Sequence, residues 1–347
     1  MPTITSEPEL TERQMTYVAA LNEALHLCMA SDPRVFVMGL GAPDAAAAFG
    51  SLDGLASKYG AKRVVDMPIS ENAMTGIMLG AALNGMRPVM THIRLEFAML
   101  AIDQIVNQAA KWHYTFGGRA SAPLVIRMIV GRGWGQGPQH SQSLQSWFAH
   151  VPGLKVIMPA TPYDAKGLLI AAIEDDSPVV CIEHRWLYNI DGPVPEGVYR
   201  VPIGPPKILR SGRDVSIAAT SYMSFEAMRA AQLLSEEGID AEVLDVHSLN
   251  PLDAAPILES VRKTGNLIVA DTGWRSFGVA AEIVSRVVEG AFGDLKNAPV
   301  RIALPDVPTP TTRALANYYY PGVHDILAAA RRLTGRPSRP AETRRCS

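Results

Sequence analysis

One acidic residue, Glu71, stands at the start of an otherwise small and apolar stretch, "PISENAMTGIMLGAALNG", which covers residues 68–85. The apolar spacing predicts a helix that begins near Glu71 and stops at Gly85, just before Pro88. The free N–H groups and the dipole of a helix favour an acid in the first turn, and Ser70 is a candidate N-cap. The simplest interpretation is therefore a first-turn acid on a buried helix. A functional role for the acid depends on what the rest of the chain carries.

A second candidate for chemistry is His140, which lies in the glycine-dense segment "GRGWGQGPQHSQ". The glycines allow close backbone turns around a ligand, but their spacing matches neither the Walker nor the Rossmann phosphate loop. A loop histidine can donate or accept a proton near neutral pH, and a hydrogen-bonded structural histidine is the equally weighted alternative. The remaining histidines with weaker contexts are interpreted as structural or surface residues: His113, His150, His184, His247 and His324.

The elements around these two segments predict a parallel sheet. Short apolar runs typical of buried strands ("VFVMGL", "RPVMTHI", "APLVIRMIV", "LKVIMPA", "PVVCIEH") alternate with stretches of helical spacing, such as "TYVAALNEALHLCMAS" and "AIDQIVNQAAKWHY". This alternation predicts helices on both faces of the sheet. Doubly wound sheets bind ligands at the carboxyl ends of their strands, and both candidate segments follow a strand or enter a helix.

The alternation breaks at residues 191–212, where proline and glycine accumulate, and we place a domain linker there. A second set of strand-like runs follows ("VSIAATS", "DAEVLDVHS", "NLIVADTG", "VRIALPD"), with helices expected around 224–237, 253–263, 277–290 and 323–333. The predicted fold class is α/β with two doubly wound domains, at residues 14–190 and 213–335. Residues 336–347 are polar and are expected to form a disordered tail.

Composition restricts the classes of function. The chain has 347 residues, of which 48% are hydrophobic, so two domains can each have a full core. The net charge of −2 gives no sign of the excess positive charge that binding to nucleic acid or to an anionic membrane requires. Cys28, Cys181 and Cys346 lack metal-ligand spacing and are expected to be reduced thiols. Without a signal or transit pattern, or the apolar run of about 20 residues that spans a membrane, we expect a cytoplasmic protein.

Four blocks of sequence together resemble the beta subunit of the thiamine-diphosphate-dependent 2-oxo acid dehydrogenases, the family of pyruvate, acetoin and branched-chain enzymes. The blocks are "VVDMPISENAMTGIMLGAALNGMRPV", "AIDQIVNQAAKWHYTFGGR", "PQHSQSLQSWFAHVPGLKVIMPATPYDAKGLL" and "DVPTPTTRALANYYYPGVHDI". The resemblance covers roughly residues 14–335. It implies an N-terminal pyrimidine-binding transketolase-like domain and a C-terminal transketolase-like domain.

The resemblance assigns expected roles to residues of the first domain. In this family the acid of the Ile-Ser-Glu motif hydrogen-bonds the aminopyrimidine ring of thiamine diphosphate and helps to form its reactive tautomer, and Glu71 matches that acid. Phe97 matches the phenylalanine that packs on the ring. Ile69 matches a backbone contact to the ring, and Ile93 completes the expected cofactor-binding set. His140 matches the loop histidine near the reacting carbon, which assists the intermediate or the transfer to a lipoyl group.

The resemblance also implies metal ions and partners. The segment "AAIEDDSP" resembles the family's potassium-binding turn, and a plain helix-to-strand loop is the alternative. Its oxygen ligands would come from Leu124, Ala172, Ile173, Asp175 and Ser177. The family's magnesium and diphosphate site needs Gly-Asp-Gly and a downstream Asn, which we do not find in the chain. A separate alpha subunit would supply that site, with Mg²⁺, at the interface of an α2β2 assembly.

Several residues depart from the family pattern. Leu40 stands where an acid usually contributes to a water-filled link between paired active sites, so that link is in doubt. The other departures are Thr91, His92, Arg94, Arg132, Trp134 and Gln136, together with His247 and Asn250, whose positions are often held by arginine. They point away from pyruvate oxidation. If Arg94 and Arg132 face the pocket with His92, the substrate is more polar than pyruvate; the alternative is that they turn outward or pair with Glu96.

The leading hypothesis is an enzyme subunit that works with an alpha chain, and with a lipoyl acyltransferase as a candidate partner, to decarboxylate a 2-oxo acid and transfer the acyl or ketol unit. One alternative is the C-terminal subunit of a split transketolase. It ranks second because the segments "CIEHRWLY" and "QHSQ" look more like the dehydrogenase beta chain. The other alternative is a non-catalytic assembly paralogue. The presence of Glu71, Phe97 and His140 together argues against that.

Overall fold

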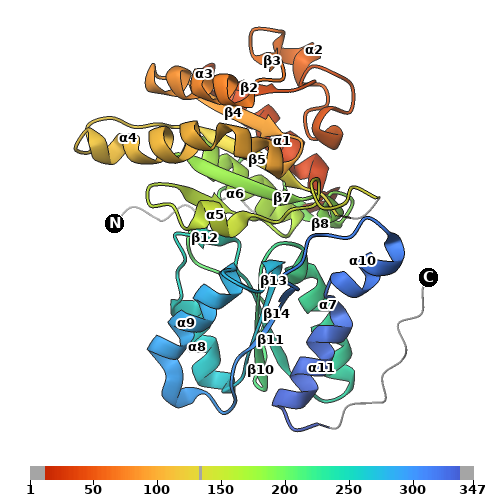
Figure 1. Cartoon of the computed structure of the whole chain (residues 1–347). Coiled ribbons are helices and arrows are strands. Elements are labelled where there is room, and N and C mark those ends of the chain that lie inside the picture. Colours follow the sequence, from red (N-terminus) through yellow and green to blue (C-terminus); the bar gives the residue numbers. More distant parts are fainter. Residues whose placement is uncertain (1–11, 133–134, 337–347) are drawn as a thin grey trace, which may run out of the picture.

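Two stacked α/β units make up the chain in the computed structural model, which describes residues 12–132 and 135–336 (Figure 1). The Trp134 and Cys346 sites considered above lie outside these residues, as does the expected tail from residue 337 onward. Each unit has its own sheet with helices on both faces. The α/β fold class with two doubly wound sheets is therefore confirmed.

The N-terminal unit is built on a seven-stranded sheet in the order β12-β6-β7-β5-β4-β2-β3. Its strands run parallel except for β12, which is antiparallel to β6. The strands are β2 (Val35–Gly39), β3 (Val64–Asp66), β4 (Arg87–His92), β5 (Val125–Val130), β6 (Lys155–Ile157), β7 (Val179–His184) and β12 (Ser248–Asn250). The five apolar runs predicted as strands in this half are β2, β4, β5, β6 and β7.

Successive side chains along these strands point to opposite faces of the sheet and belong to two separate hydrophobic cores. Phe36 and Met38 of β2 belong to one buried cluster, and Val35 and Val37 belong to the other. The helical elements of this unit are α1 (Tyr17–Ser31), η1 (Ala47–Gly50), α2 (Leu55–Tyr59), α3 (Glu71–Leu83), η2 (Leu95–Ala101), η3 (Asp103–Ala109), α4 (Ala110–Thr115), α5 (Gln145–Ala149), α6 (Pro162–Glu174) and η4 (Arg185–Leu187). Helices α1 and α6 cover one face, and α3, η2 and η3 cover the other.

The C-terminal unit has a five-stranded sheet in the order β14-β13-β10-β11-β9, parallel except for β9. Its strands are β9 (Lys207–Arg210), β10 (Val215–Ala219), β11 (Ala241–Asp245), β13 (Leu267–Trp274) and β14 (Val300–Leu304). Its helices are α7 (Tyr222–Glu236), α8 (Ala255–Thr264), α9 (Val279–Ala291), η5 (Phe292–Asp294), α10 (Arg313–Tyr319) and α11 (Val323–Leu333). Helices α7 and α11 pack on one face, and α8 and α9 pack on the other (Figure 1).

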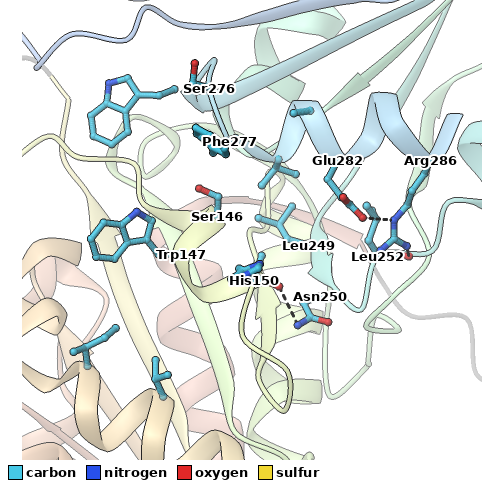
Figure 2. A pocket seen from close by; sticks show the side chains of 17 residues that line it. Ser146, Trp147, His150, Leu249, Asn250, Leu252, Ser276, Phe277, Glu282 and Arg286 are labelled. Atoms are coloured by element: carbon cyan, nitrogen blue, oxygen red, sulfur yellow. Dashed lines mark hydrogen bonds and ion pairs between the residues drawn. The ribbon is translucent and has the colours of Figure 1, made fainter. Parts of the chain in front are cut away.

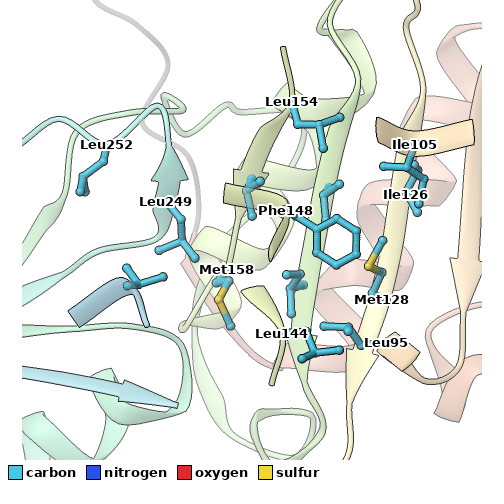
Figure 3. Packing of buried hydrophobic residues seen from close by; sticks show 14 of the residues in the cluster. Leu95, Ile105, Ile126, Met128, Leu144, Phe148, Leu154, Met158, Leu249 and Leu252 are labelled. Atoms are coloured by element: carbon cyan, nitrogen blue, oxygen red, sulfur yellow. The ribbon is translucent and has the colours of Figure 1, made fainter. Parts of the chain in front are cut away.

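Three features join the two units. Strand β12 follows β11 in sequence but pairs with β6 of the first sheet. Residues 191–212, expected as a linker, carry β8 (Asp191–Pro195), which pairs with β1 (Glu12–Thr16), and also β9. One buried cluster continues from Phe148 and Met158 of the first unit to Leu249 and Leu252 of the second (Figure 3). The two units are thus held against each other by strand pairing and by apolar packing.

Local helix geometry differs from the sequence prediction in two places. Helix α3 begins at Glu71 and ends at Leu83, and Gly85 follows with a φ of +90°. Ser70 precedes α3, but its side chain makes no capping hydrogen bond. The helix expected from "AIDQIVNQAAKWHY" begins as the π-helix η3 and continues as α4. Within the described residues, we find no helix with the length and apolar character needed to cross a bilayer.

Candidate functional site

Glu71 is the first residue of α3, and this helix packs against η2. The side chain is buried, with 8% exposure, and its carboxyl group has no hydrogen-bond or ion-pair partner among the described residues. The turn before it is fixed by Asp66, whose Oδ1 accepts the backbone N–H groups of Gly41 at 2.7 Å and Met67 at 2.9 Å. The result is a buried carboxyl group free to bind a ligand.

The other expected cofactor contacts surround this acid in sequence and in the fold. Ile69 is 80% exposed, two residues before Glu71. Ile93 follows β4, and its carbonyl accepts a hydrogen bond from Nη1 of Arg94 at 2.6 Å. Phe97 lies on η2, the element against which α3 packs. The structure therefore places these residues on adjacent elements at the carboxyl end of β4, where a doubly wound sheet holds its ligands.

His140 is in direct contact with η2. Its Nδ1 lies 2.6 Å from Oε1 of Glu96, and its ring meets that of Phe97 edge to face at 5.5 Å between centroids. Burial raises the pKa of Glu96, against the opposing effects of its own backbone N–H, of His140 and of Arg94. The sequence interpretation considered Glu96 only as a partner for arginine, because a pair separated by 44 residues leaves no local signal. The structure pairs Glu96 with His140.

Unpartnered polar atoms gather in the same segment. Oγ1 of Thr91, Nε2 of His92 and Oε2 of Glu96 are buried and make no hydrogen bond within the described part of the chain. Burial lowers the pKa of His92 to about 4, so this histidine is neutral at physiological pH. Buried polar atoms without partners are costly and mark places where a ligand or a partner chain can satisfy them. The unpartnered atoms of Thr91, His92 and Glu96 therefore suit a polar heterocyclic ligand bound at the carboxyl end of β4.

The two arginines of this region have different neighbours. Arg94 donates from Nε to Oε1 of Gln136 at 3.0 Å, and its guanidinium lies 4.9 Å from the ring centre of Phe49. Arg132 is surrounded by the rings of Trp186 and Tyr320, each at 4.1 Å, and of Tyr222 at 5.0 Å. Both arginine side chains are buried. Arg132 is thus packed into an aromatic site, and Arg94 is closer in sequence to the cofactor-binding segment.

The turn that resembles a potassium site is already hydrogen-bonded. The carbonyls of Ile173 and Asp175 accept from Nη1 of Arg87 at 3.1 and 3.0 Å. The carboxylate of Asp175 pairs with Lys155 and accepts the N–H of Ser177. The carbonyl of Leu124 accepts from Val179, and that of Ala172 accepts from Asp175. A cation would have to share these oxygens through their second lone pairs.

A groove of about 970 Å³ lies between the two units (Figure 2). Its lining includes Trp147 and His150 of the first unit together with Leu249, Asn250 and Phe277. None of the residues predicted for the cofactor or potassium sites lines this groove. Among the described residues there is also no group of three or more His, Cys, Asp or Glu side chains arranged to hold a metal ion.

Comparison with known proteins identifies the domains and the relatives of this chain. Residues 13–190 match the model of the transketolase pyrimidine binding domain, and residues 204–326 match that of the transketolase C-terminal domain. The chain is 43% identical over 330 residues to the beta subunit of acetoin:2,6-dichlorophenolindophenol oxidoreductase from Cupriavidus necator, covering 92% of this chain and 97% of the relative.

It is also 46% identical over 325 residues to the mitochondrial pyruvate dehydrogenase E1 component subunit beta-2 of Oryza sativa subsp. japonica. That alignment covers 92% of this chain and 86% of the relative. A solved structure titled "Split gene transketolase, inactive beta4 tetramer" is similar in fold, with a TM-score of 0.72 and 23% identity over 92% of this chain and 98% of that one.

Proposed function

Because this chain belongs to the family of beta subunits of thiamine-diphosphate-dependent 2-oxo acid dehydrogenases, we propose that it forms the aminopyrimidine side of an active site that an alpha subunit completes. The observation that carries the proposal is Glu71, a buried carboxyl group without a partner in the described residues, at the start of the helix that packs on η2. When bound, thiamine diphosphate supplies the nucleophilic carbon that attacks the 2-oxo group. The residues of this chain bind the pyrimidine ring of the cofactor and transfer protons.

Each side chain has a defined task in this proposal. Glu71 shares a proton with a ring nitrogen, because a carboxyl group can both donate and accept a proton over a hydrogen bond. Phe97 offers an aromatic face or edge to the ring, and the backbone at Ile69 and Ile93 supplies polar contacts. His140 moves a proton at the reacting end of the substrate. These tasks follow the expected family roles, and the adjacency of α3 and η2 supports them.

The partner of this chain is an alpha subunit. We propose that it carries the Gly-Asp-Gly motif, binds Mg²⁺ and the diphosphate, and forms an α2β2 assembly with this chain. A lipoyl acyltransferase is the proposed acceptor of the acyl group. The turn at residues 172–177 is proposed to bind K⁺, with its carbonyl oxygens shared with Arg87.

Reconstitution tests this function. The chain is co-expressed with an alpha chain that carries Gly-Asp-Gly and is purified as a complex. Turnover of 2-oxo acids and of sugar ketols is then measured with thiamine diphosphate, Mg²⁺ and an artificial electron acceptor. We expect cofactor-dependent oxidation of a 2-oxo acid or of acetoin. A complex that binds the cofactor but transfers only ketol units between sugars would support a split transketolase instead, which at 23% identity shares the fold alone.

A further inference from the structure

The side chains of Glu96 and His140 form a close pair at the edge of the candidate site. Oε1 of Glu96 lies 2.6 Å from Nδ1 of His140. The Glu96 side chain is 10% exposed, whereas that of His140 is 46% exposed. One nitrogen of the imidazole is thus anchored to a mostly buried carboxyl group, while much of the ring stays accessible to a ligand.

Phe97 holds the same imidazole from a second direction. Its ring meets that of His140 at an interplanar angle of 64°. Glu96 and Phe97 are consecutive residues of η2, so one short helix determines both the direction of the hydrogen bond and the plane of the ring. A ring held at two points has few orientations left, which is what a proton-transferring group requires.

His140 is the side chain that hydrogen-bonds to Glu96, whose carboxyl group also interacts with its own backbone N–H. Arg94 lies two residues before Glu96 and acts on it electrostatically, but its guanidinium bonds to Gln136 and to the carbonyl of Ile93. The second carboxyl oxygen of Glu96, Oε2, is buried and has no partner in the part of the chain that the structure describes. An imidazolium at His140 would therefore be the closest cation to this carboxyl group.

We propose that Glu96 is a positioning residue for His140. Its carboxylate accepts the Nδ1–H of His140 and leaves the lone pair of Nε2 to take a proton from the substrate or the acceptor. When Nε2 takes that proton, the ring becomes an imidazolium, and Glu96 compensates the new charge. This inference rests on the proposed function, which places His140 near the reacting atoms.

The first test reads the tautomer and needs no turnover. The full chain is labelled with ¹⁵N-histidine, the His140 signals are assigned by their loss in His140→Asn, and long-range ¹H–¹⁵N spectra report which ring nitrogen carries the proton. We expect the Nδ1–H form in the parent chain and in Glu96→Gln, whose amide oxygen still accepts a hydrogen bond. In Glu96→Ala the preference for this form is expected to disappear.

The second test uses the complex with an alpha subunit. Glu96→Ala is expected to lower kcat/KM by about 10- to 100-fold, mainly through kcat, by analogy with the carboxylates that orient metal-bound histidines. In Glu96→Gln the acid limb of the pH profile of kcat/KM is expected to move to lower pH, because the imidazolium loses its counter-charge. Glu289→Gln, an acid-to-amide change at an exposed position of α9, is the matched control.

The outcomes separate the two proposals. If the parent complex shows no thiamine-diphosphate-dependent turnover, the proposed function fails and the positioning role fails with it, even if the tautomer is as expected. If the parent complex is active, but Glu96→Ala matches Glu289→Gln in kcat/KM and the tautomer does not change, only the positioning role is overturned. Should thermal unfolding show that Glu96→Ala does not fold, an unchanged pH profile in Glu96→Gln overturns the inference by itself.

Discussion

At the scale of single residues, Glu71 gives the sharpest prediction. In Glu71→Gln we expect turnover of the reconstituted complex to fall by a factor on the order of 10²–10⁴, the usual contribution of an acid–base group. Glutamine can hydrogen-bond the pyrimidine ring but cannot exchange its proton. Steady-state kinetics measure the loss, and thermal unfolding checks that the fold is intact. Activity close to that of the parent would remove Glu71 from the proposed site.

Arg94 carries a prediction about the substrate. It is buried, its hydrogen bonds go to neutral groups, and no carboxylate of the described residues lies within ion-pair distance. A buried guanidinium is stabilised by an anion, and its planar shape suits a carboxylate or phosphate. For a 2-oxo acid with a second anionic group, Arg94→Ala should lower kcat/KM by about 10- to 100-fold, equivalent to about 1.5–3 kcal/mol.

Two comparisons make the Arg94 prediction specific. Turnover of pyruvate by the same variant should change much less, and Arg94→Lys should restore part of the activity toward the anionic substrate. Arg132→Ala is expected to lower stability instead, because its guanidinium is packed against three aromatic rings. If Arg94→Ala affects pyruvate and the anionic substrates in the same ratio, Arg94 does not select the substrate.

The candidate residues differ in how far the sequence could identify them. Glu71, Phe97 and His140 lie in recognisable motifs, so the sequence alone identifies them as candidates. The link between Glu96 and His140 could not be identified in this way, since it joins an element after β4 to the loop after β5. A contact of this kind depends on how the loop folds back over the sheet edge.

At the scale of elements, the buried strands were predictable from the sequence, and β8 was not. Strands β2, β5 and β7 are buried along their whole length and appear in the sequence as continuous apolar runs. Strand β8 contains Gly192 and two prolines, so its sequence is typical of a loop. Its pairing with β1, from the other end of the unit, makes it a strand. Pairing over such a sequence distance leaves no local pattern.

The end of β11 carries a prediction about pH. His247 lies with its Nδ1 3.8 Å from Oδ2 of Asp245, and Asp164 of α6 also acts on it electrostatically. Burial alone would lower the pKa of His247, but Asp245 and Asp164 overcome this effect and raise it. A histidine whose pKa is raised in the folded state stabilises the fold most below its unfolded pKa of about 6.5, and the stabilisation is lost as the pH rises through the folded pKa.

The measurement is the free energy of unfolding of the parent chain and of His247→Gln from pH 6 to pH 9. The difference in favour of the parent should be largest at the acid end of this range and should shrink as the pH rises. His324→Gln, at an exposed histidine of α11, is the control and should show no such trend. A difference that grows with pH would contradict the ion pair at the end of β11.

At the scale of the whole molecule, the two units of the chain are firmly joined, and the candidate site lies within the first of them. Strand β12 ties the second unit to the first sheet, and buried side chains continue across the junction. The site residues identified above all belong to the first unit, and the second unit supports the loop after β5 through hydrogen bonds from Ser143 and Gln145 to Thr272. Alternation of strands and helices predicted both units, whereas their joining through β12 depends on long-range pairing.

This arrangement predicts that the chain alone binds thiamine diphosphate weakly. It offers a carboxyl group and an aromatic ring for the pyrimidine, but the described residues contain no cluster of metal-ligating side chains for Mg²⁺ and the diphosphate. The charged end of the cofactor forms charge-assisted contacts, which are stronger than neutral ones. Titration calorimetry with the chain alone should therefore show weak binding that Mg²⁺ barely improves, and the complex with an alpha subunit should bind tightly only when Mg²⁺ is present. Tight, Mg²⁺-dependent binding by the chain alone would show that it carries a site for the diphosphate and Mg²⁺ of its own, either within one chain or in a homodimer.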